Sequence, residues 1–254
     1  MRRAVALLLL LVTPLAAQPA AEAPIPLQQA FVAKRYPHDP GAFTEGLFID
    51  AGHLFESTGM IGRSSVRQVD LKTGKVLRKV TLSSPYFGEG IAPWKGQILS
   101  LTWQNGVGFR WDSKSLKKLG NFRYTGEGWA LTSTGKELVM SDGSDTLRFI
   151  DPADFTVKRT LKVTIQGRPL RLINELEWVD GQVFANVWMT DYVVRIDPSS
   201  GKVVGLIDLG PLHRAAGVFG HDRVANGIAW DAKSRKLYMT GKEWPSLFEV
   251  RLGD

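Results

Sequence analysis

Short apolar runs separated by glycine-containing turns repeat along most of this chain. In the first repeat, a polar residue opens the apolar run at residues 45–49, a turn follows at residues 51–52, and a second apolar run covers residues 54–57. Five such hairpins begin 39 to 52 residues apart, at Glu45, Glu89, Gly128, Asn174 and Asn226. Because regularly spaced short strands are typical of repeated antiparallel units, the pattern predicts an all-β fold.

Four of the five hairpins continue into a second hairpin. Their third strands are expected at residues 66–70, 108–112, 147–151 and 193–197, and their fourth strands at residues 75–82, 116–124, 156–163 and 202–209. The fifth unit has a third strand at residues 247–251 and no fourth, whereas residues 29–34 form an unassigned strand near the start of the chain. We therefore expect a five-bladed β-propeller whose ring is closed by this N-terminal strand in the last blade. An open sandwich of hairpins is the alternative.

The chain begins with the features of an export signal. Arg2 and Arg3 precede an apolar run at residues 4–12, which is too short to span a bilayer, and small residues follow up to Ala17. We expect residues 1–17 to be a signal peptide, residues 18–26 a short linker, and residues 27–254 a single propeller domain. The mature protein is then periplasmic or secreted, without membrane attachment.

Composition excludes several classes of function. There is no cysteine, so disulfides, thiolate metal sites and cysteine nucleophiles are excluded. The net charge is +7, but the basic residues are scattered, which argues against a nucleic-acid partner. The four histidines lack the spacing of zinc ligands, so we expect no metal site. His38 and His221, each followed by aspartate, are expected in turn or capping roles.

The repeat predicts which side chains meet. The inner strand of each propeller blade lines the central channel, so the residues that open these strands form a ring at one mouth. The ends of the second strands lie beside them. These ends fall on Gly59, Trp103, Asp142, Trp188 and Lys242. Because buried charges are costly unless they are paired, this concentration of polar groups indicates a binding pocket, with a water-filled polar channel as the alternative.

Other residues are placed by the same register. Trp129 follows the first ring, and the connections at residues 166–173 and 210–225 lie on the same face as the rings. Trp103 and Trp188 are expected to wall the pocket. Trp178 and Trp230, in the middle of strands, are expected in the core.

Seven segments of the chain resemble the plant-type glutaminyl cyclases and their bacterial relatives. These segments are residues 43–47, 55–59, 63–67, 86–90, 174–177, 226–230 and 240–245, and the resemblance extends from about residue 36 to residue 252. It implies a glutaminyl-peptide cyclotransferase that converts the N-terminal glutamine of peptides or proteins to pyroglutamate and releases ammonia. It also implies no cofactor; a structural cation on the axis is left open, and we expect a monomer.

The resemblance assigns roles to individual residues. Glu89 is implied as the general acid/base. The residues implied to line the substrate pocket are Phe43, Glu45, Trp103, Trp129, Asn174, Trp188 and Lys242. We expect the Asn174 amide and the Lys242 ammonium to stabilise the oxyanion. Plant members typically carry glutamine at the position of Glu45, and a second carboxylate there is expected to raise the pKa of Glu89.

Two rival functions remain at this point. A calcium-dependent propeller lactonase or esterase would gather carboxylates and amides around a metal, and Glu45, Glu89, Asp142, Asn174 and Asn226 are candidates for its ligands. Its activity would be lost on chelation. A non-enzymatic periplasmic binding propeller would not turn over a glutaminyl peptide.

Overall fold

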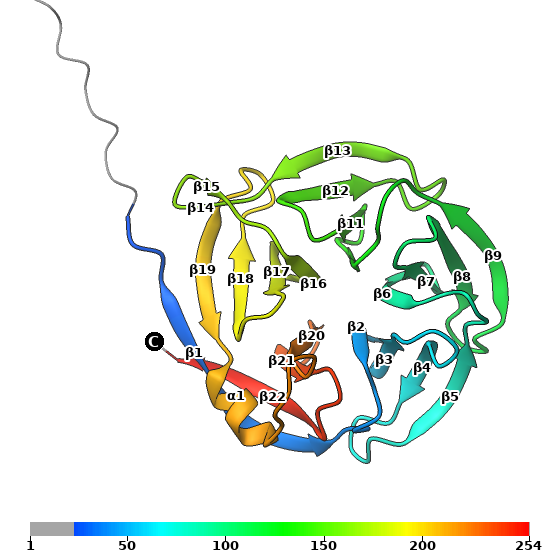
Figure 1. Ribbon diagram of the computed structural model, residues 1–254, viewed down its shortest axis with the longest axis horizontal. Helices are drawn as coiled ribbons and strands as arrows, with labels where there is room; N and C mark the ends of the chain where they lie inside the picture. Colours follow the sequence, from blue (N-terminus) through cyan, green and yellow to red (C-terminus); the bar gives the residue numbers. More distant parts are fainter. Residues whose placement is uncertain (1–22, 254) are drawn as a thin grey trace, which may run out of the picture.

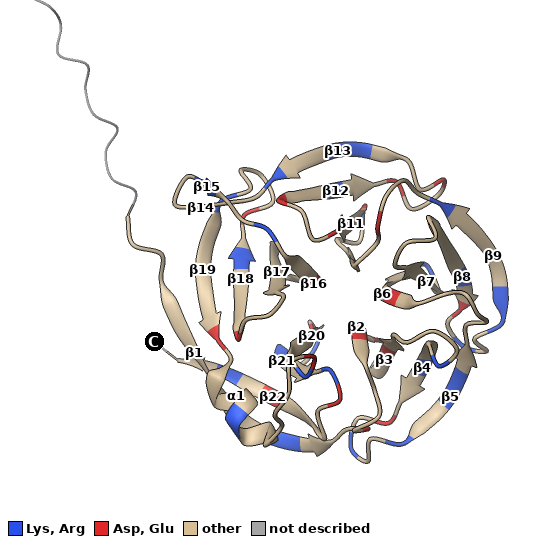
Figure 2. Cartoon of the chain, viewed as in Figure 1, with Lys and Arg blue, Asp and Glu red and all other residues tan. Residues whose placement is uncertain are grey.

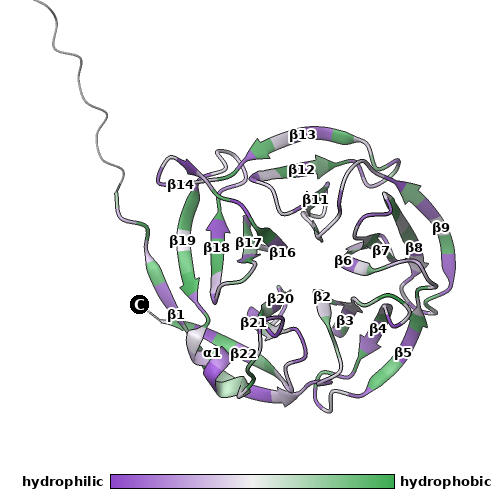
Figure 3. Ribbon diagram, in the orientation of Figure 1, coloured by the Kyte–Doolittle hydropathy of each residue, from purple (hydrophilic) through white to green (hydrophobic). Residues whose placement is uncertain are grey.

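The computed structural model describes residues 23–253, and the regular secondary structure of this part is almost entirely β-strand. The predicted signal peptide lies outside the described residues. The strands are grouped into sheets that are arranged in a ring around a central axis (Figure 1). Apolar residues occur in strands all round this ring (Figure 3). The predicted all-β class is confirmed.

Three sheets are four-stranded and antiparallel, and each follows the chain order. They are β2 (Thr44–Asp50), β3 (His53–Thr58), β4 (Ser65–Val69) and β5 (Val76–Thr81); β6 (Gly88–Trp94), β7 (Gln97–Thr102), β8 (Val107–Asp112) and β9 (Lys118–Arg123); and β10 (Ala130–Ser133), β11 (Leu138–Ser141), β12 (Thr146–Ile150) and β13 (Val157–Lys162). A two-stranded hairpin, β14 (Thr164–Ile165) and β15 (Arg168–Pro169), follows them.

The remaining strands form one eight-stranded sheet in the order β16-β17-β18-β19-β1-β22-β21-β20. Its members are β16 (Ile173–Val179), β17 (Gln182–Val187), β18 (Tyr192–Ile196), β19 (Val203–Asp208), β1 (Leu27–Pro37), β22 (Ser246–Gly253), β21 (Lys236–Gly241) and β20 (Ala225–Asp231). Strand β1 pairs in parallel with β19 and antiparallel with β22, with Ala30 opposite Leu252. The expected pairing of residues 29–34 with the last strand is therefore observed.

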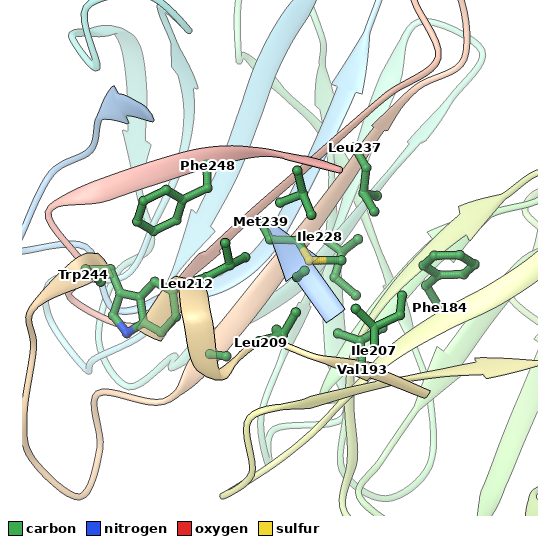
Figure 4. Close-up of a cluster of buried hydrophobic side chains, with 14 of the residues drawn as sticks. Phe184, Val193, Ile207, Leu209, Leu212, Ile228, Leu237, Met239, Trp244 and Phe248 are labelled. Atoms are coloured by element: carbon green, nitrogen blue, oxygen red, sulfur yellow. The ribbon is translucent and has the colours of Figure 1, made fainter. Parts of the chain in front are cut away.

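Burial falls from the inner strands to the outer ones. Strand β2 is buried at five of its seven positions, whereas the peripheral strand β5 is exposed at five of six. Five apolar clusters fill the interior. The largest includes Trp244, Phe248 and Met239 (Figure 4). Trp178 and Trp230 are only half-buried at the edges of two clusters, so their expected place in the core is only partly correct.

The connection at residues 210–225 contains the one helix of the described chain, α1 (Gly210–Ala216). Pro211 lies in its first turn, where a missing N–H costs little, and Gly217 ends it in the left-handed conformation at φ 67°. The guanidinium of Arg35 on β1 donates to the carbonyl of Ala215, which fixes the helix against the N-terminal strand. No helix within residues 23–253 is long and apolar enough to cross a membrane.

Candidate active site

β-bulges place the first candidate side chains at the centre of the ring. The pairing of β2 with β3 shifts between Thr44 and Gly46, and the pairing of β6 with β7 shifts between Gly88 and Ile91. Glu45 and Glu89 lie within these bulges, at the second positions of β2 and β6. Acidic residues are coloured on both of these strands near the centre of the ring (Figure 2). Because a bulge leaves a residue unpaired and bends the strand, it re-aims the side chain away from the regular ladder.

Asn174 and Asn226 occupy equivalent bulges at the starts of β16 and β20. The third unit differs, because β10 begins at Ala130 and not at the expected Gly128. The Gly128 N–H bonds to the carbonyl of Trp103 instead of to β11, and a Cβ at this glycine would lie 2.8 Å from the Tyr124 hydroxyl oxygen. Gly128 therefore lies before the strand, and the close approach of Tyr124 leaves no room for a side chain there.

Left-handed residues end the second strands next to the site. Met60, Met189 and Glu243 have φ values of 82°, 66° and 58°. Each directly follows a residue of the predicted second ring, such as Trp188 or Lys242. Residues other than glycine adopt this conformation less readily, so each of these turns carries some local backbone strain.

A single cavity of about 200 Å³ brings the predicted site together. Its lining residues are Phe43, Glu45, Phe87, Glu89, Trp103, Trp129, Asn174, Trp188, Asp222 and Lys242. All eight residues that the sequence assigned to the site lie in this wall. The ring residues Gly59, Gly128, Asp142 and Asn226 do not line it.

Asp142 supports a loop and does not face the cavity as expected. Its carboxylate lies 2.7 Å from the Arg148 guanidinium. The same guanidinium donates to the carbonyl oxygens of Thr125 at 2.7 Å and Glu127 at 3.1 Å. The Asp142 carboxylate therefore pairs with Arg148, which in turn holds the loop that connects β9 to β10.

The carboxylate of Glu45 is held by protein partners. Lys242 Nζ lies 2.8 Å from Glu45 Oε1, and the Asn226 amide donates to Oε2 at 3.2 Å. The Lys242 ammonium also lies 4.5 Å from the centroid of the Phe43 ring. Burial raises the pKa of Glu45, although the charge of Lys242 opposes this effect. Both oxygens of this carboxylate are therefore occupied.

The carboxyl of Glu89 is in the opposite situation. Glu89 is 6% exposed and lines the cavity, and within residues 23–253 no protein group donates a hydrogen bond to its side chain. Burial, followed by the negative charge of Glu45, raises its pKa well above the ordinary value. The site therefore favours the protonated form of Glu89 and leaves both of its oxygens free to react.

Asn174 presents an acceptor to the same cavity. Its Oδ1 is buried and has no hydrogen-bond partner within the described chain. Buried polar atoms in folded proteins are nearly always paired, and an exception points to a role. Asn174 and Glu89 thus provide two uncommitted polar groups in one cavity.

The sequence model of the glutamine cyclotransferase family matches residues 5–252. This chain belongs to the glutamine cyclotransferase family. It is 42% identical over 226 residues to the glutaminyl-peptide cyclotransferase of Arabidopsis thaliana, which covers 87% of this chain and 70% of the relative. The crystal structure of Myxococcus xanthus glutaminyl cyclase matches with a TM-score of 0.86 at 40% identity, over 91% of this chain and 98% of that one. The resemblance drawn from the sequence segments is confirmed.

Two wall residues of this glutamine cyclotransferase were missed by the sequence reasoning. The Phe87 ring lies 6.2 Å from that of Phe43 and 5.9 Å from that of Trp103, so it joins two predicted wall residues. It is two positions before Glu89, and that spacing was the signal that could have found it. Asp222 lies in the long connection that was expected on this face.

The polar residues beside this cavity also differ from expectation. His38 is not a capping residue: it is buried, with Nε2 2.9 Å from Glu56 Oε1 and Nδ1 2.6 Å from the Trp244 carbonyl oxygen. Glu56 is also 2.7 Å from the Arg67 guanidinium. The pKa of Glu56 is lowered to about 2, because the nearby positive charges outweigh its burial. His38 is therefore a link in a buried charge network.

Two further carboxyls on β16 connect the inner strands. Glu175 accepts from the backbone N–H groups of Leu47 at 3.2 Å and Ile228 at 2.9 Å. Glu177 accepts from the backbone N–H of Trp230 at 2.8 Å. Burial raises the pKa of both groups, that of Glu177 to about 8. Within residues 23–253, no group of three histidine, aspartate or glutamate side chains could hold a metal ion.

Proposed function

We propose that this chain is a glutaminyl-peptide cyclotransferase in which Glu89 is the general acid/base. The activity follows from membership of the glutamine cyclotransferase family and the name of the Arabidopsis relative. The role of Glu89 rests on one contrast between two carboxyls of the same cavity. Glu45 is held by Lys242 and Asn226, whereas Glu89 has no donor from the described chain. Of these two carboxyls, only Glu89 is free to exchange protons with a substrate.

The reaction balances with one proton shuttle. The neutral α-amine of the substrate attacks the carbon of its own γ-carboxamide, and a new C–N bond closes the ring. The amine loses one proton, and the departing amide nitrogen gains one as the old C–N bond breaks. Glu89, protonated at the start, delivers its proton to the leaving nitrogen and accepts the proton of the attacking amine. Pyroglutamyl peptide and ammonia leave, and the enzyme returns to its starting form.

Lys242 and Asn174 are proposed to stabilise the oxygen of the reacting carboxamide. An ammonium has three N–H donors, so Lys242 retains donors beyond the one that faces Glu45. The Asn174 amide group offers N–H donors, and its unpaired Oδ1 accepts an N–H of the substrate carboxamide. If the substrate began with glutamate, its side-chain carboxylate oxygen would face Asn174 Oδ1 without a proton between them. We therefore infer that Asn174 selects glutamine over glutamate.

The aromatic wall is proposed to hold the substrate and exclude water. Trp129 and Trp188 meet edge to face with their centroids 5.6 Å apart. The cavity of about 200 Å³ is smaller than the roughly 300–1,000 Å³ of pockets for drug-sized ligands. This size suits a single terminal residue, with the rest of the peptide outside. Confinement brings the amine close to its target carbon.

We propose that the fold is a five-bladed propeller. The four-stranded sheets and the two halves of the eight-stranded sheet supply the five units, and the pairing of β1 with β22 supports ring closure. We also propose that the protein is exported to the periplasm or secreted after removal of residues 1–17, on the basis of the sequence at the start of the chain. We further propose that the enzyme acts as a monomer and needs no cofactor.

Ammonia release from a peptide that begins with glutamine tests the function. We expect one ammonia for each N-terminal amine lost, and no ammonia from the same peptide with an acetylated N-terminus, because acetylation removes the nucleophile. Activity should persist after exhaustive chelation while the fold is checked by circular dichroism. Absence of turnover would contradict the proposal, and loss of activity that metal restores would support a calcium-dependent hydrolase.

A further inference from the structure

One carboxylate at the rim of the cavity holds two tryptophans of the wall. Glu127 Oε2 accepts hydrogen bonds from Trp103 Nε1 and from Trp129 Nε1, both at 2.8 Å. Glu127 Oε1 accepts from Gln104 Nε2 at 3.1 Å. Trp103 follows β7, and Trp129 precedes β10, so a single oxygen joins side chains from two different sheets.

The backbone of Glu127 is itself fixed. The Arg148 guanidinium on β12 donates to the carbonyl oxygens of Thr125 and Glu127, at 2.7 Å and 3.1 Å. Asp142 holds this guanidinium at 2.7 Å. The loop that carries Glu127 is therefore tied to a neighbouring strand, and its carboxylate is a rigid acceptor and not a mobile surface group.

Glu127 closes a break in the aromatic wall. Ring contacts join Trp129 to Trp188 at 5.6 Å and Trp103 to Phe87 at 5.9 Å. Between Trp103 and Trp129, the aromatic contacts of the described chain include none. Trp103 is 39% exposed, so packing covers only part of its surface. The hydrogen bonds to Glu127 supply the missing constraint.

We propose that Glu127 is a positioning residue for substrate binding, which acts by fixing the two indoles at the mouth of the cavity. The inference rests on the proposed function, because its kinetic readout is glutamine cyclisation. Loss of the acceptor releases Trp103 and Trp129 and weakens the hold on the substrate. The effect falls mainly on KM, because neither indole exchanges protons in the reaction.

Three variants separate positioning from charge. Glu127→Ala removes the acceptor, and we expect KM to rise about tenfold with kcat changed much less. Glu127→Gln keeps a carbonyl oxygen for both indoles without the charge, and Gln104 can turn its amide to match. We expect KM within about twofold of the wild type for this variant. Glu137→Ala is the matched control, since that carboxylate pairs with Arg159 and lies outside the cavity.

The indole N–H resonances give a second readout that is independent of turnover. In a spectrum of 15N-labelled protein, the eight tryptophans give separate side-chain signals. Two of these, from Trp103 and Trp129, should move upfield in Glu127→Ala and stay near their wild-type positions in Glu127→Gln, because a charge-assisted bond deshields the proton. If Glu127→Ala does not fold, Glu127→Asp replaces it, because the shorter side chain cannot reach both indoles.

Two outcomes overturn the proposal. One is a Glu127→Ala enzyme with unchanged KM and unchanged indole signals. The other is a Glu127→Gln enzyme as impaired as Glu127→Ala, which would assign the effect to charge. Glu127→Ala and Glu127→Gln both remove a negative charge that raises the pKa of Glu89, so a shift of the pH profile that both variants share reports this electrostatic effect and not positioning. If the wild type releases no ammonia, the proposed function fails, while the indole signals still test whether Glu127 fixes Trp103 and Trp129.

Discussion

Replacing Glu177 with glutamine should stabilise the fold at neutral pH. Glu177 lies on β16 and is buried, and its carboxyl accepts from the Trp230 N–H at 2.8 Å and the Thr132 hydroxyl at 3.1 Å. These hydrogen bonds favour its charged form, but the cost of burying a charge outweighs them. Burial raises its pKa from 4.5 to about 8. The folded protein therefore keeps this carboxyl neutral near pH 7, and glutamine has the same shape without a proton to lose.

The magnitude follows from the shift. A carboxyl whose pKa is raised on folding contributes its full stability below pH 4.5, and this stability is lost as the pH rises toward 8. At pH 7 the unfolded chain ionises the group and the folded chain does not. The difference of about 2.5 units between pH 7 and the ordinary pKa of 4.5 corresponds to a cost of about 3 kcal/mol for keeping the carboxyl protonated. Glu177→Gln removes this cost, less any loss from imperfect hydrogen bonding of the amide.

Urea unfolding at pH 4, 7 and 8.5 measures the effect. We expect Glu177→Gln to differ little from the wild type at pH 4 and to be more stable by up to about 3 kcal/mol at pH 7. Glu137→Gln is the control: this half-buried carboxylate pairs with Arg159, and its replacement should show no such gain in stability at pH 7. A variant that is equally destabilised at all three pH values would refute the reasoning, because it would mean that folding does not shift the pKa of Glu177.

The remaining predictions concern charge and closure. Glu56→Gln should lower the free energy of unfolding by about 3 kcal/mol at pH 7, because a carboxyl whose pKa is lowered to about 2 stabilises the fold above pH 4.5. Denaturant titration measures this loss, and an unchanged midpoint would contradict it. Glu45→Gln should move the alkaline limb of kcat to lower pH, because removing a negative charge lowers the pKa of Glu89; a move to higher pH would count against the assignment. Deletion through Lys34 should lower Tm strongly, since β1 is paired on both edges, and an unchanged Tm would rule out closure by this strand.

The hairpin repeat could be read from the sequence because the inner strands are buried along most of their length, so they are short apolar runs separated by turns. Strand β4 was expected at residues 66–70 and spans Ser65–Val69, and β19 was expected at residues 202–209 and spans Val203–Asp208. Helix α1 was missed, because its seven residues are too few to establish a helical period. The late start of β10 at Ala130 was also missed, because the Gly128 N–H bonds to the carbonyl of Trp103, 25 positions away, which no local pattern encodes.

The site was predictable to the extent that it follows the repeat. Glu45 and Asn174 open inner strands, so counting along the repeat places them at one mouth. The β-bulges that aim these side chains leave no mark in the hydrophobic pattern. Glu127 lies in a connection outside the repeat, and its importance arises from contacts with Trp103 and Trp129 that exist only in three dimensions. The environment of His38 likewise depends on residues more than 200 positions away.

The most direct test of the account compares Glu89→Gln with Glu45→Gln in a single set of kinetic measurements. Because Glu89 is the carboxyl without a protein partner, we predict that Glu89→Gln loses kcat by about 10²–10⁴-fold while its affinity for a glutaminyl peptide changes little. Glu45→Gln should keep substantial turnover. Calorimetric binding of the peptide to the inactive variant separates loss of chemistry from loss of the fold. An active Glu89→Gln enzyme beside an inactive Glu45→Gln enzyme would contradict the central claim and transfer the acid/base role to Glu45.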